Sequence, residues 1–197
     1  MKDPDHIKKT GLFFGSFNPI HHGHLIIASY MLEFTDLDEV WFVVSPQNPL
    51  KEKKGMLADY HRLALVNLAI EDHYRFRSSN IEFGMPRPSY TIDTLARLTE
   101  KYSNRDFVLI CGTDVFPTFH KWKNYRVLLD QYRIYVYPRP GYGMGDLESH
   151  PSVRLYDAPL MEISSSFIRK AIHAGKNLDF WMPRKVYEYI LEMHFYE

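Results

Sequence analysis

Short runs of apolar residues, rich in β-branched and aromatic side chains, alternate along this chain with stretches of helical spacing. This alternation restricts the fold more than any other feature of the sequence. Because the runs are apolar at nearly every position, we expect strands that are covered on both faces, as in a parallel sheet. The predicted strands lie at residues 11–14, 39–44, 107–110, 134–137 and 153–156, with one or two more between residues 75 and 83.

Helices are expected in the intervening stretches. We expect Asp59 and Ser89 each to cap a helix, because both side chains can accept a backbone N–H at a helix start. The last two predicted helices make up a C-terminal helical part of about residues 164–197. The predicted helices lie at residues 25–34, from 59 to about 70, from 89 to about 98, and at 125–129, 165–174 and 183–194.

The class that follows is α/β. We expect a doubly wound, Rossmann-like parallel sheet with helices on both faces and a C-terminal helical segment. A barrel of eight strand–helix units is disfavoured because it needs about 250 residues, whereas the chain has 197. That length also fits a single domain over residues 1–197.

Composition and charge narrow the choice of partners and compartment. Lysine and arginine total 24 and aspartate and glutamate also total 24, so the formal net charge is zero. This balance argues against a protein that binds nucleic acid through a basic surplus. We expect no membrane partner either, because no apolar run approaches the roughly 18 residues of a span. The single cysteine, Cys111, and a polar start unlike a signal peptide favour a reducing, cytoplasmic location.

The segments that follow the predicted strands are the places to look for a site, because ligands bind beyond the carboxyl ends of the strands in such sheets. The first segment runs from Gly15 to Leu25 and holds the loop and helix start that suit an anion. Within it, His21 and His24 are three residues apart, so in a helical turn they would face the same way and donate to phosphate oxygens. Zinc binding by the histidines is the weaker interpretation, because no cysteine or carboxylate stands at a matching spacing.

Three further segments carry polar or aromatic residues near predicted strand ends or helix starts. Ile163 to Arg169 contains consecutive serines followed by an arginine, a pattern that suits a bound anion. Gly112 to Trp122 offers a carboxylate for a ribose or base and a flat ring for stacking. Ser89 to Leu95 opens a helix. Taken singly, each segment is explained at least as well by helix capping or core packing.

Taken together, these motifs resemble the nucleotidylyltransferase superfamily. Its H-x-G-H signature corresponds to His21-His22-Gly23-His24, and its I-S-S-[ST]-x-I-R signature corresponds to Ile163 to Arg169. Within the superfamily the chain is similar to the bacterial nicotinate-nucleotide adenylyltransferases, and the motifs follow one another in order from about residue 11 to 170. Phe14 departs from the family, which commonly has glycine there. The features that carry this closer resemblance are Ser45 to Lys51, Ser89 to Leu95 and Gly112 to Trp122.

The resemblance implies transfer of the adenylyl group of ATP to nicotinate mononucleotide, which gives deamido-NAD and pyrophosphate in NAD biosynthesis. It assigns catalysis to His21, His24 and Arg169. Mg²⁺ would bridge the phosphates of ATP, with no protein side chain as its ligand. The residues implied to bind ATP are Gly15, Ser16, Phe17, Gly112, Asp114, Ser164, Ser165 and Ser166. Those implied to bind the mononucleotide are Asn48, Lys51, Thr91 and Trp122.

Other functions remain open at this point. The sister pantetheine-phosphate adenylyltransferases share both signatures but lack the Ser-Tyr-Thr-x-Asp-Thr-Leu stretch, so they are the weaker alternative. A nucleotide-binding module without turnover is a second alternative, against which the intact His21, His24 and Arg169 count. A cytidylyltransferase and a metal-dependent hydrolase that uses the histidines rank lower. The sequence leaves open a homo-oligomer and the choice between the acid and amide mononucleotides.

Overall fold

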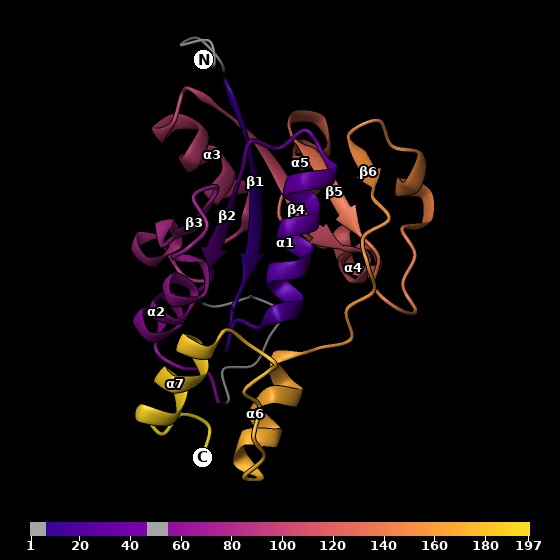
Figure 1. Ribbon diagram of the computed structural model, residues 1–197. Coiled ribbons are helices and arrows are strands. Elements are labelled where there is room, and N and C mark those ends of the chain that lie inside the picture. Colours follow the sequence, from indigo (N-terminus) through magenta and orange to yellow (C-terminus); the bar gives the residue numbers. More distant parts are fainter. Residues whose placement is uncertain (1–6, 47–54) are drawn as a thin grey trace.

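The computed structural model describes residues 7–46 and 55–197, and within them the strands form one all-parallel sheet (Figure 1). The strand order is β3-β2-β1-β4-β5-β6, which is the order of doubly wound sheets that bind dinucleotides. The predicted fold class is therefore confirmed. The strands are β1 (Lys8–Gly15), β2 (Glu39–Val44), β3 (Phe76–Ser79), β4 (Arg105–Gly112), β5 (Arg133–Tyr137) and β6 (Val153–Leu155).

Helices cover both faces of this sheet, as expected. Residues of α1, α2, α6 and α7 pack in the hydrophobic core on one face, and residues of α3, α4 and α5 pack in the core on the other. No helix among the described residues is both long and apolar enough to cross a membrane. The α-helices are α1 (His22–Phe34), α2 (Asp59–Ile70), α3 (Thr91–Lys101), α4 (Phe116–Phe119), α5 (Tyr125–Gln131), α6 (Ser165–His173) and α7 (Arg184–Glu192), and short 3₁₀ turns are η1 (Ile81–Gly84), η2 (Thr113–Val115) and η3 (Gly145–Ser149).

Strand β2 shows why the predicted strands are apolar throughout. All six of its residues are buried, and successive side chains of a strand point to opposite faces of the sheet. Phe42 and Val44 contribute to the core on the side of α1 and α2. Trp41 and Val43 contribute to the core on the side of α3. A sheet with only one covered face would show polar residues at alternate positions instead.

The chain winds in opposite directions from the centre of the sheet, which leaves an opening beyond β1 and β4. These two strands lie side by side in the middle, with Phe13 opposite Ile110. The chain then moves outward to β2 and β3 on one side and to β5 and β6 on the other. Helices α6 and α7 lie just below the carboxyl end of β1 in the view of Figure 1. This edge is where doubly wound sheets bind their ligands.

Some local predictions are wrong. Asp59 is the first residue of α2, and Ala58 is its N-cap, because the Asp59 carboxylate accepts a hydrogen bond from Arg62 instead. Ser89 is not the cap of α3 either, since its hydroxyl donates to the buried Glu82, and Tyr90 takes the cap position. The possible second strand near residue 81 is the 3₁₀ turn η1. Helix α4 was not predicted because four residues are too few to show a period.

Candidate functional site

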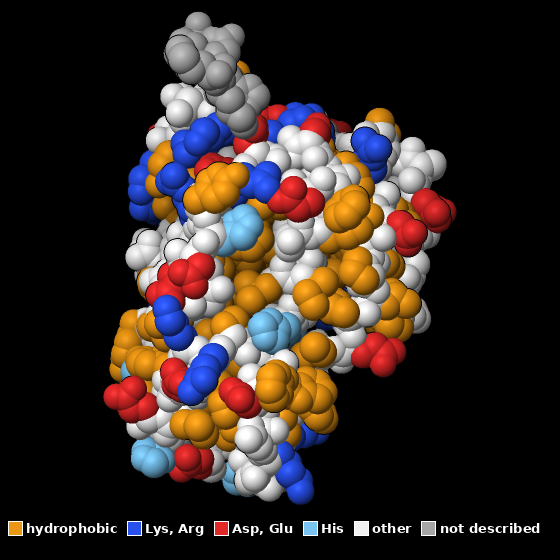
Figure 2. All heavy atoms as spheres, viewed as in Figure 1, with side chains coloured by type: hydrophobic (Ala, Val, Ile, Leu, Met, Phe, Trp, Pro, Cys, Tyr) orange, Lys and Arg blue, Asp and Glu red, His pale blue; other side chains and the backbone are white. Residues whose placement is uncertain are grey.

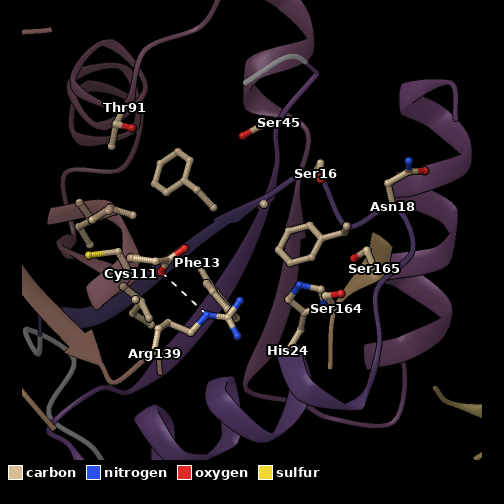
Figure 3. Close-up of a pocket in the computed structure, with 18 of the residues that line it drawn as sticks. Phe13, Ser16, Asn18, His24, Ser45, Thr91, Cys111, Arg139, Ser164 and Ser165 are labelled. Carbon is tan, nitrogen blue, oxygen red and sulfur yellow. Dashed lines mark ion pairs between the residues drawn. The ribbon is translucent and has the colours of Figure 1, made fainter. Parts of the chain in front are cut away.

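A cavity of about 530 Å³ opens at this carboxyl edge, and Figure 3 shows some of its lining. It is bounded by the segments that follow β1, β4 and β5 and by the starts of α3 and α6. Asn48 and Lys51 lie outside the described residues. All of the other predicted site residues line this one cavity, namely Gly15, Ser16, Phe17, His21, His24, Thr91, Gly112, Asp114, Trp122, Ser164, Ser165, Ser166 and Arg169.

The loop between β1 and α1, residues 15–19, turns sharply beneath the cavity. Phe17 has a φ of 44°, a left-handed conformation that is uncommon for a bulky residue. Its ring is 1% exposed and packs against Phe13 and Phe42 at centroid distances of 6.0 and 5.6 Å. A Cβ on Gly15 would lie 2.7 Å from this ring. Glycine at position 15 therefore makes room for Phe17.

The carbonyl oxygens of this loop are held by other parts of the chain. A loop whose carbonyls are bound in this way offers N–H groups, rather than C=O groups, to an anion. The cavity side of the loop is thus suited to phosphate. The hydrogen bonds are Ser45 N to Gly15 O at 2.9 Å, Arg62 Nη1 to Ser16 O at 2.6 Å, Arg169 Nη1 to Asn18 O at 2.8 Å and Ser165 Oγ to Pro19 O at 2.9 Å.

His21 and His24 stand together at the start of α1, where His21 is the N-cap. Their rings stack with centroids 3.8 Å apart, so the two side chains face the same way, as their spacing in the sequence predicts. The backbone N–H of His21 donates to His24 Nδ1 at 3.3 Å. When the His24 ring is neutral, its proton is therefore on Nε2. Figure 3 shows this side chain directed into the cavity.

His21 is the deeper of the two histidines, with 4% of its surface exposed. Burial, followed by the charge of Arg139 and of His22, lowers its pKa to about 3. His21 is therefore neutral at physiological pH. A Cβ on Gly23 would lie 3.0 Å from His21 Nδ1, which explains the glycine between the two histidines. His21 therefore offers the cavity a neutral imidazole.

Arg169 and the three serines before it face the histidines from α6. Arg169 lines the same cavity as the two histidines. Its Nη1 donates to Asn18 O, and its Nη2 donates to Ser166 Oγ at 3.3 Å. Ser164 caps α6 by accepting from Phe167 N at 3.2 Å. Because the Ser165 hydroxyl donates its proton to a backbone oxygen, the group with which Ser165 can donate to a phosphate is its backbone N–H, at the first position of α6. The N-termini of α1 and α6 both border the cavity, and helix N-termini favour anions.

Arg139 is a cavity residue that the sequence analysis did not assign. It follows β5, its Nη1 donates to Met161 O at 2.8 Å, and its Nε lies 3.8 Å from Asp114 Oδ1. The dashed line in Figure 3 marks this ion pair, and the guanidinium points toward the same part of the cavity as His24. The sequence contained a signal for Arg139, because this residue comes two positions after the predicted end of a strand at residue 137, and ligands bind beyond strand ends in such sheets.

The far side of the cavity combines a carboxylate, an aromatic ring and a helix start. A Cβ on Gly112 would collide with Asp114 Oδ1, so glycine leaves room for that carboxylate. Trp122 packs against Phe119 at 5.1 Å and presents part of its surface to the cavity. Thr91 begins α3, whose first N–H groups lack helical partners. These groups suit a ribose, a flat ring and an anion, respectively.

The start of α3 is held in place by a buried carboxylate. Glu82 is 2% exposed and accepts hydrogen bonds from Ser89 Oγ at 2.8 Å and Thr94 Oγ1 at 2.7 Å. These bonds fix the segment that carries Thr91.

Within the described ranges, no group of three or more histidine, cysteine, aspartate or glutamate side chains could hold a metal ion. The thiol of Cys111 also lines the cavity, and burial, with the charge of Asp114, raises its pKa, so it is not a nucleophile.

Charged side chains of both signs are spread over the face drawn in Figure 2. The formal net charge is zero, and an extended basic surface is the feature that nucleic-acid binding would require. Among the described residues, the cations that line the cavity are Lys121, Lys123, Arg139 and Arg169, and they surround one small site. Their arrangement suits a small anionic ligand better than a polymer.

Sequence comparisons match the chain to a family and to individual relatives. Residues 12–171 match the sequence model of the cytidylyltransferase-like family. The chain is 52% identical over 191 residues, 96% of its length and 99% of the relative's, to a probable nicotinate-nucleotide adenylyltransferase of Flavobacterium johnsoniae. A relative of the same description from Bacteroides thetaiotaomicron is 49% identical over 93% of this chain and 91% of its own length.

The fold matches solved structures as well. A Plasmodium falciparum nicotinic acid mononucleotide adenylyltransferase complexed with NaAD superimposes with a TM-score of 0.81, covering 96% of this chain and 97% of that one at 19% identity. A putative nicotinate-nucleotide adenylyltransferase from Vibrio parahaemolyticus gives a TM-score of 0.71 at 21% identity, covering 96% and 95%. These structures support the doubly wound fold.

Proposed function

The chain belongs to the cytidylyltransferase-like family and is a nucleotidyltransferase, and we propose that it transfers the adenylyl group of ATP to nicotinate mononucleotide. The products are deamido-NAD and pyrophosphate, in a step of NAD biosynthesis. The observation that carries the proposal is that His24 and Arg169, 145 positions apart in the sequence (169 − 24), line one cavity beyond β1 and β4.

The reaction is an in-line displacement at the α-phosphorus of ATP. A phosphate oxygen of the mononucleotide forms a new bond to that phosphorus, and the bond from the phosphorus to the β-phosphate oxygen breaks. The electron pair leaves with pyrophosphate. Little covalent chemistry is required of the protein, so catalysis consists of positioning and charge stabilisation.

The part of the cavity next to the loop of residues 15–19 and the start of α6 provides this positioning and this charge stabilisation. We assign the triphosphate to the loop of residues 15–19 and the N-termini of α1 and α6. The N–H on His24 Nε2 donates to the oxygen that gains charge as pyrophosphate leaves. His21, held neutral by burial, supports the same oxygens without competing for a proton. Arg169 and Arg139 balance the remaining negative charge. Preorganised donors of this kind are the largest contribution to catalysis in many enzymes.

The opposite end of the cavity accommodates the rest of the substrates. Gly112 and Asp114 suit the adenosine, Trp122 suits the pyridine ring, and the N–H groups at Thr91 suit the nicotinate carboxylate. Asn48 and Lys51 remain predicted contacts of the mononucleotide. The partners of the chain are therefore ATP and nicotinate mononucleotide. Its one cysteine, a free and buried thiol, supports a reducing, cytoplasmic compartment for this reaction.

Magnesium fits this site as a companion of ATP. The acidic side chains that line the cavity are Asp114 and Glu82, and both already have partners, in Arg139 and in Ser89 and Thr94. Mg²⁺ is commonly held by substrate phosphates and water rather than by a protein cage. When bound, it would neutralise part of the triphosphate charge and leave the positioning of the phosphates to the chain.

The experiment that tests the function offers ATP with nicotinate mononucleotide, nicotinamide mononucleotide or phosphopantetheine in parallel and measures released pyrophosphate. We expect rapid release with nicotinate mononucleotide and a much slower reaction with the other two. Faster release with phosphopantetheine would identify a pantetheine-phosphate adenylyltransferase instead. ATP binding without release with any acceptor would indicate a binding module.

A further inference from the structure

A tyrosine in the segment after α7 contacts the loop beneath the cavity. Tyr196 Oη donates a hydrogen bond of 2.7 Å to Asn18 Oδ1, and 178 positions separate these residues in the sequence. The family match ends at residue 171, so this contact joins the loop to a part of the chain beyond the matched region. None of the site motifs includes Tyr196.

Asn18 is well placed to pass on the effect of this contact. It is 4% exposed, and its side chain also accepts from Leu57 N at 3.2 Å and donates to Gly55 O at 3.0 Å. Its backbone oxygen accepts from Arg169. The orientation of Asn18 therefore sets both the course of the loop and the position of the guanidinium across the cavity.

The segment that carries Tyr196 adopts an unusual backbone. His194 and Tyr196 have φ values of 53° and 68°, a left-handed region in which residues other than glycine are uncommon. Such conformations persist where surrounding contacts hold them, and they are often found at functional sites. Phe195 lies between these two residues and packs against His61 and Tyr189 at 4.7 and 5.9 Å. The aromatic packing holds the segment in the conformation that brings Tyr196 to Asn18.

The Tyr196 hydroxyl is a proton donor here. Burial raises the pKa of Tyr196, even though Arg169 and Arg62 act in the opposite direction. The hydroxyl therefore stays protonated at physiological pH. It donates to the oxygen of an amide that is itself nearly buried, and a lost partner at such a position is costly.

We propose that Tyr196 is a positioning residue for the phosphates of ATP. It acts through Asn18, keeping the loop of residues 15–19 and Arg169 in the arrangement that receives the triphosphate. This proposal rests on the proposed function, since it concerns the same cavity. It adds a residue that touches neither substrate and lies outside the matched region.

The test compares Tyr196→Phe with the matched variant Tyr189→Phe. The Tyr189 hydroxyl bonds to His61 Nδ1 at 2.9 Å, so the control also removes one hydroxyl from the same aromatic cluster but leaves Asn18 intact. For Tyr196→Phe we expect kcat/KM for ATP and the affinity for inorganic triphosphate to fall about three- to tenfold, the range for one hydrogen bond. For Tyr189→Phe we expect changes of less than about twofold, with thermal midpoints of the two variants alike.

The outcomes separate this proposal from the function itself. If Tyr196→Phe binds triphosphate and uses ATP as well as the unchanged protein does, Tyr196 is not a positioning residue. If Tyr189→Phe causes an equal loss, the effect is a general property of the cluster, and the proposal is again overturned. If the unchanged protein releases no pyrophosphate from ATP and nicotinate mononucleotide, the proposed function fails. Triphosphate affinity, which needs no acceptor, still decides the role of Tyr196 in that case.

Discussion

Replacing Arg62 by methionine removes a cation that the fold has enclosed completely. The side chain is 0% exposed, and each of its five N–H groups has an acceptor. Removing the guanidinium leaves these acceptors without this partner at a place that is largely shielded from water. The bonds are Nε to Leu57 O at 3.1 Å, Nη1 to Ser16 O and Ser45 O at 2.6 and 2.8 Å, and Nη2 to Pro46 O and Asp59 Oδ1 at 3.4 and 2.6 Å.

The size of the effect follows from burial. Breaking a buried ion pair by removing one partner costs about 3–5 kcal/mol, and unpaired carbonyls add to this value. Asp59 is 21% exposed, so water can replace part of its interaction and we use the lower half of the range. We expect Arg62→Met to lower the free energy of unfolding by about 3–4 kcal/mol. This is a large part of the roughly 5–15 kcal/mol typical of a protein domain.

The assay is urea denaturation followed by circular dichroism, with Arg87→Met as the matched control. Arg87 pairs with the same carboxylate at 2.7 Å, but its side chain is 51% exposed, and exposed pairs contribute about 0.2–1 kcal/mol. We expect Arg62→Lys to lower the free energy of unfolding by most of the amount expected for Arg62→Met, because one ammonium cannot reach all of the acceptors that surround a planar guanidinium. A loss below about 1 kcal/mol in Arg62→Met, or one equal to that of Arg87→Met, would refute the reasoning.

Three further predictions concern the cavity. His24→Ala should lower kcat by about 10²-fold or more, because a donor to the leaving pyrophosphate is lost; an unchanged rate of pyrophosphate release in the folded variant would exclude His24 from catalysis. Trp122→Ala should raise KM for nicotinate mononucleotide more than KM for ATP, and equal increases in steady-state assays would indicate a structural role. The pKa of His21 is lowered from 6.5 to about 3, so the unfolded chain binds a proton at this site that the folded chain does not. The contribution of His21 to stability is therefore present above about pH 6.5 and is lost as pH falls toward 3, by up to about 1.4 kcal/mol per pH unit. Urea titrations of the unchanged protein and of His21→Gln between pH 7 and 4 should differ in slope by about one proton, and equal slopes would contradict the lowered pKa.

Much of this fold and part of the site could be predicted from local patterns. The runs that became β1, β2, β4 and β5 are apolar at nearly every position, since each strand is covered on both faces. His21 and His24 needed only the start of a helix to bring their rings together. Arg169 was found because a run of serines marks a helix start, and a cation at that end is unfavourable without an anion.

The predictions that failed concern two side chains that bind another side chain instead of capping a helix. Ser89 has the chemistry of a helix cap, but the buried Glu82 accepts its hydroxyl. Asp59 likewise turns to Arg62. In both cases the competing partner is within seven positions in the sequence, and only the packing of the folded chain decides which hydrogen bond forms.

The sequence by itself determined the order of strands and helices, the class of sheet and the histidine pair, because spacing along the chain controls which side chains share a face over one or two turns. Only the tertiary structure decided that Arg139 faces His24, that Arg62 lies enclosed beneath the loop of residues 15–19, and that Tyr196 reaches Asn18. The partners in these contacts are far apart in the sequence, and what joins them is packing in space. Burial of the shared core and the need to satisfy each enclosed polar group then settle which of the possible contacts form.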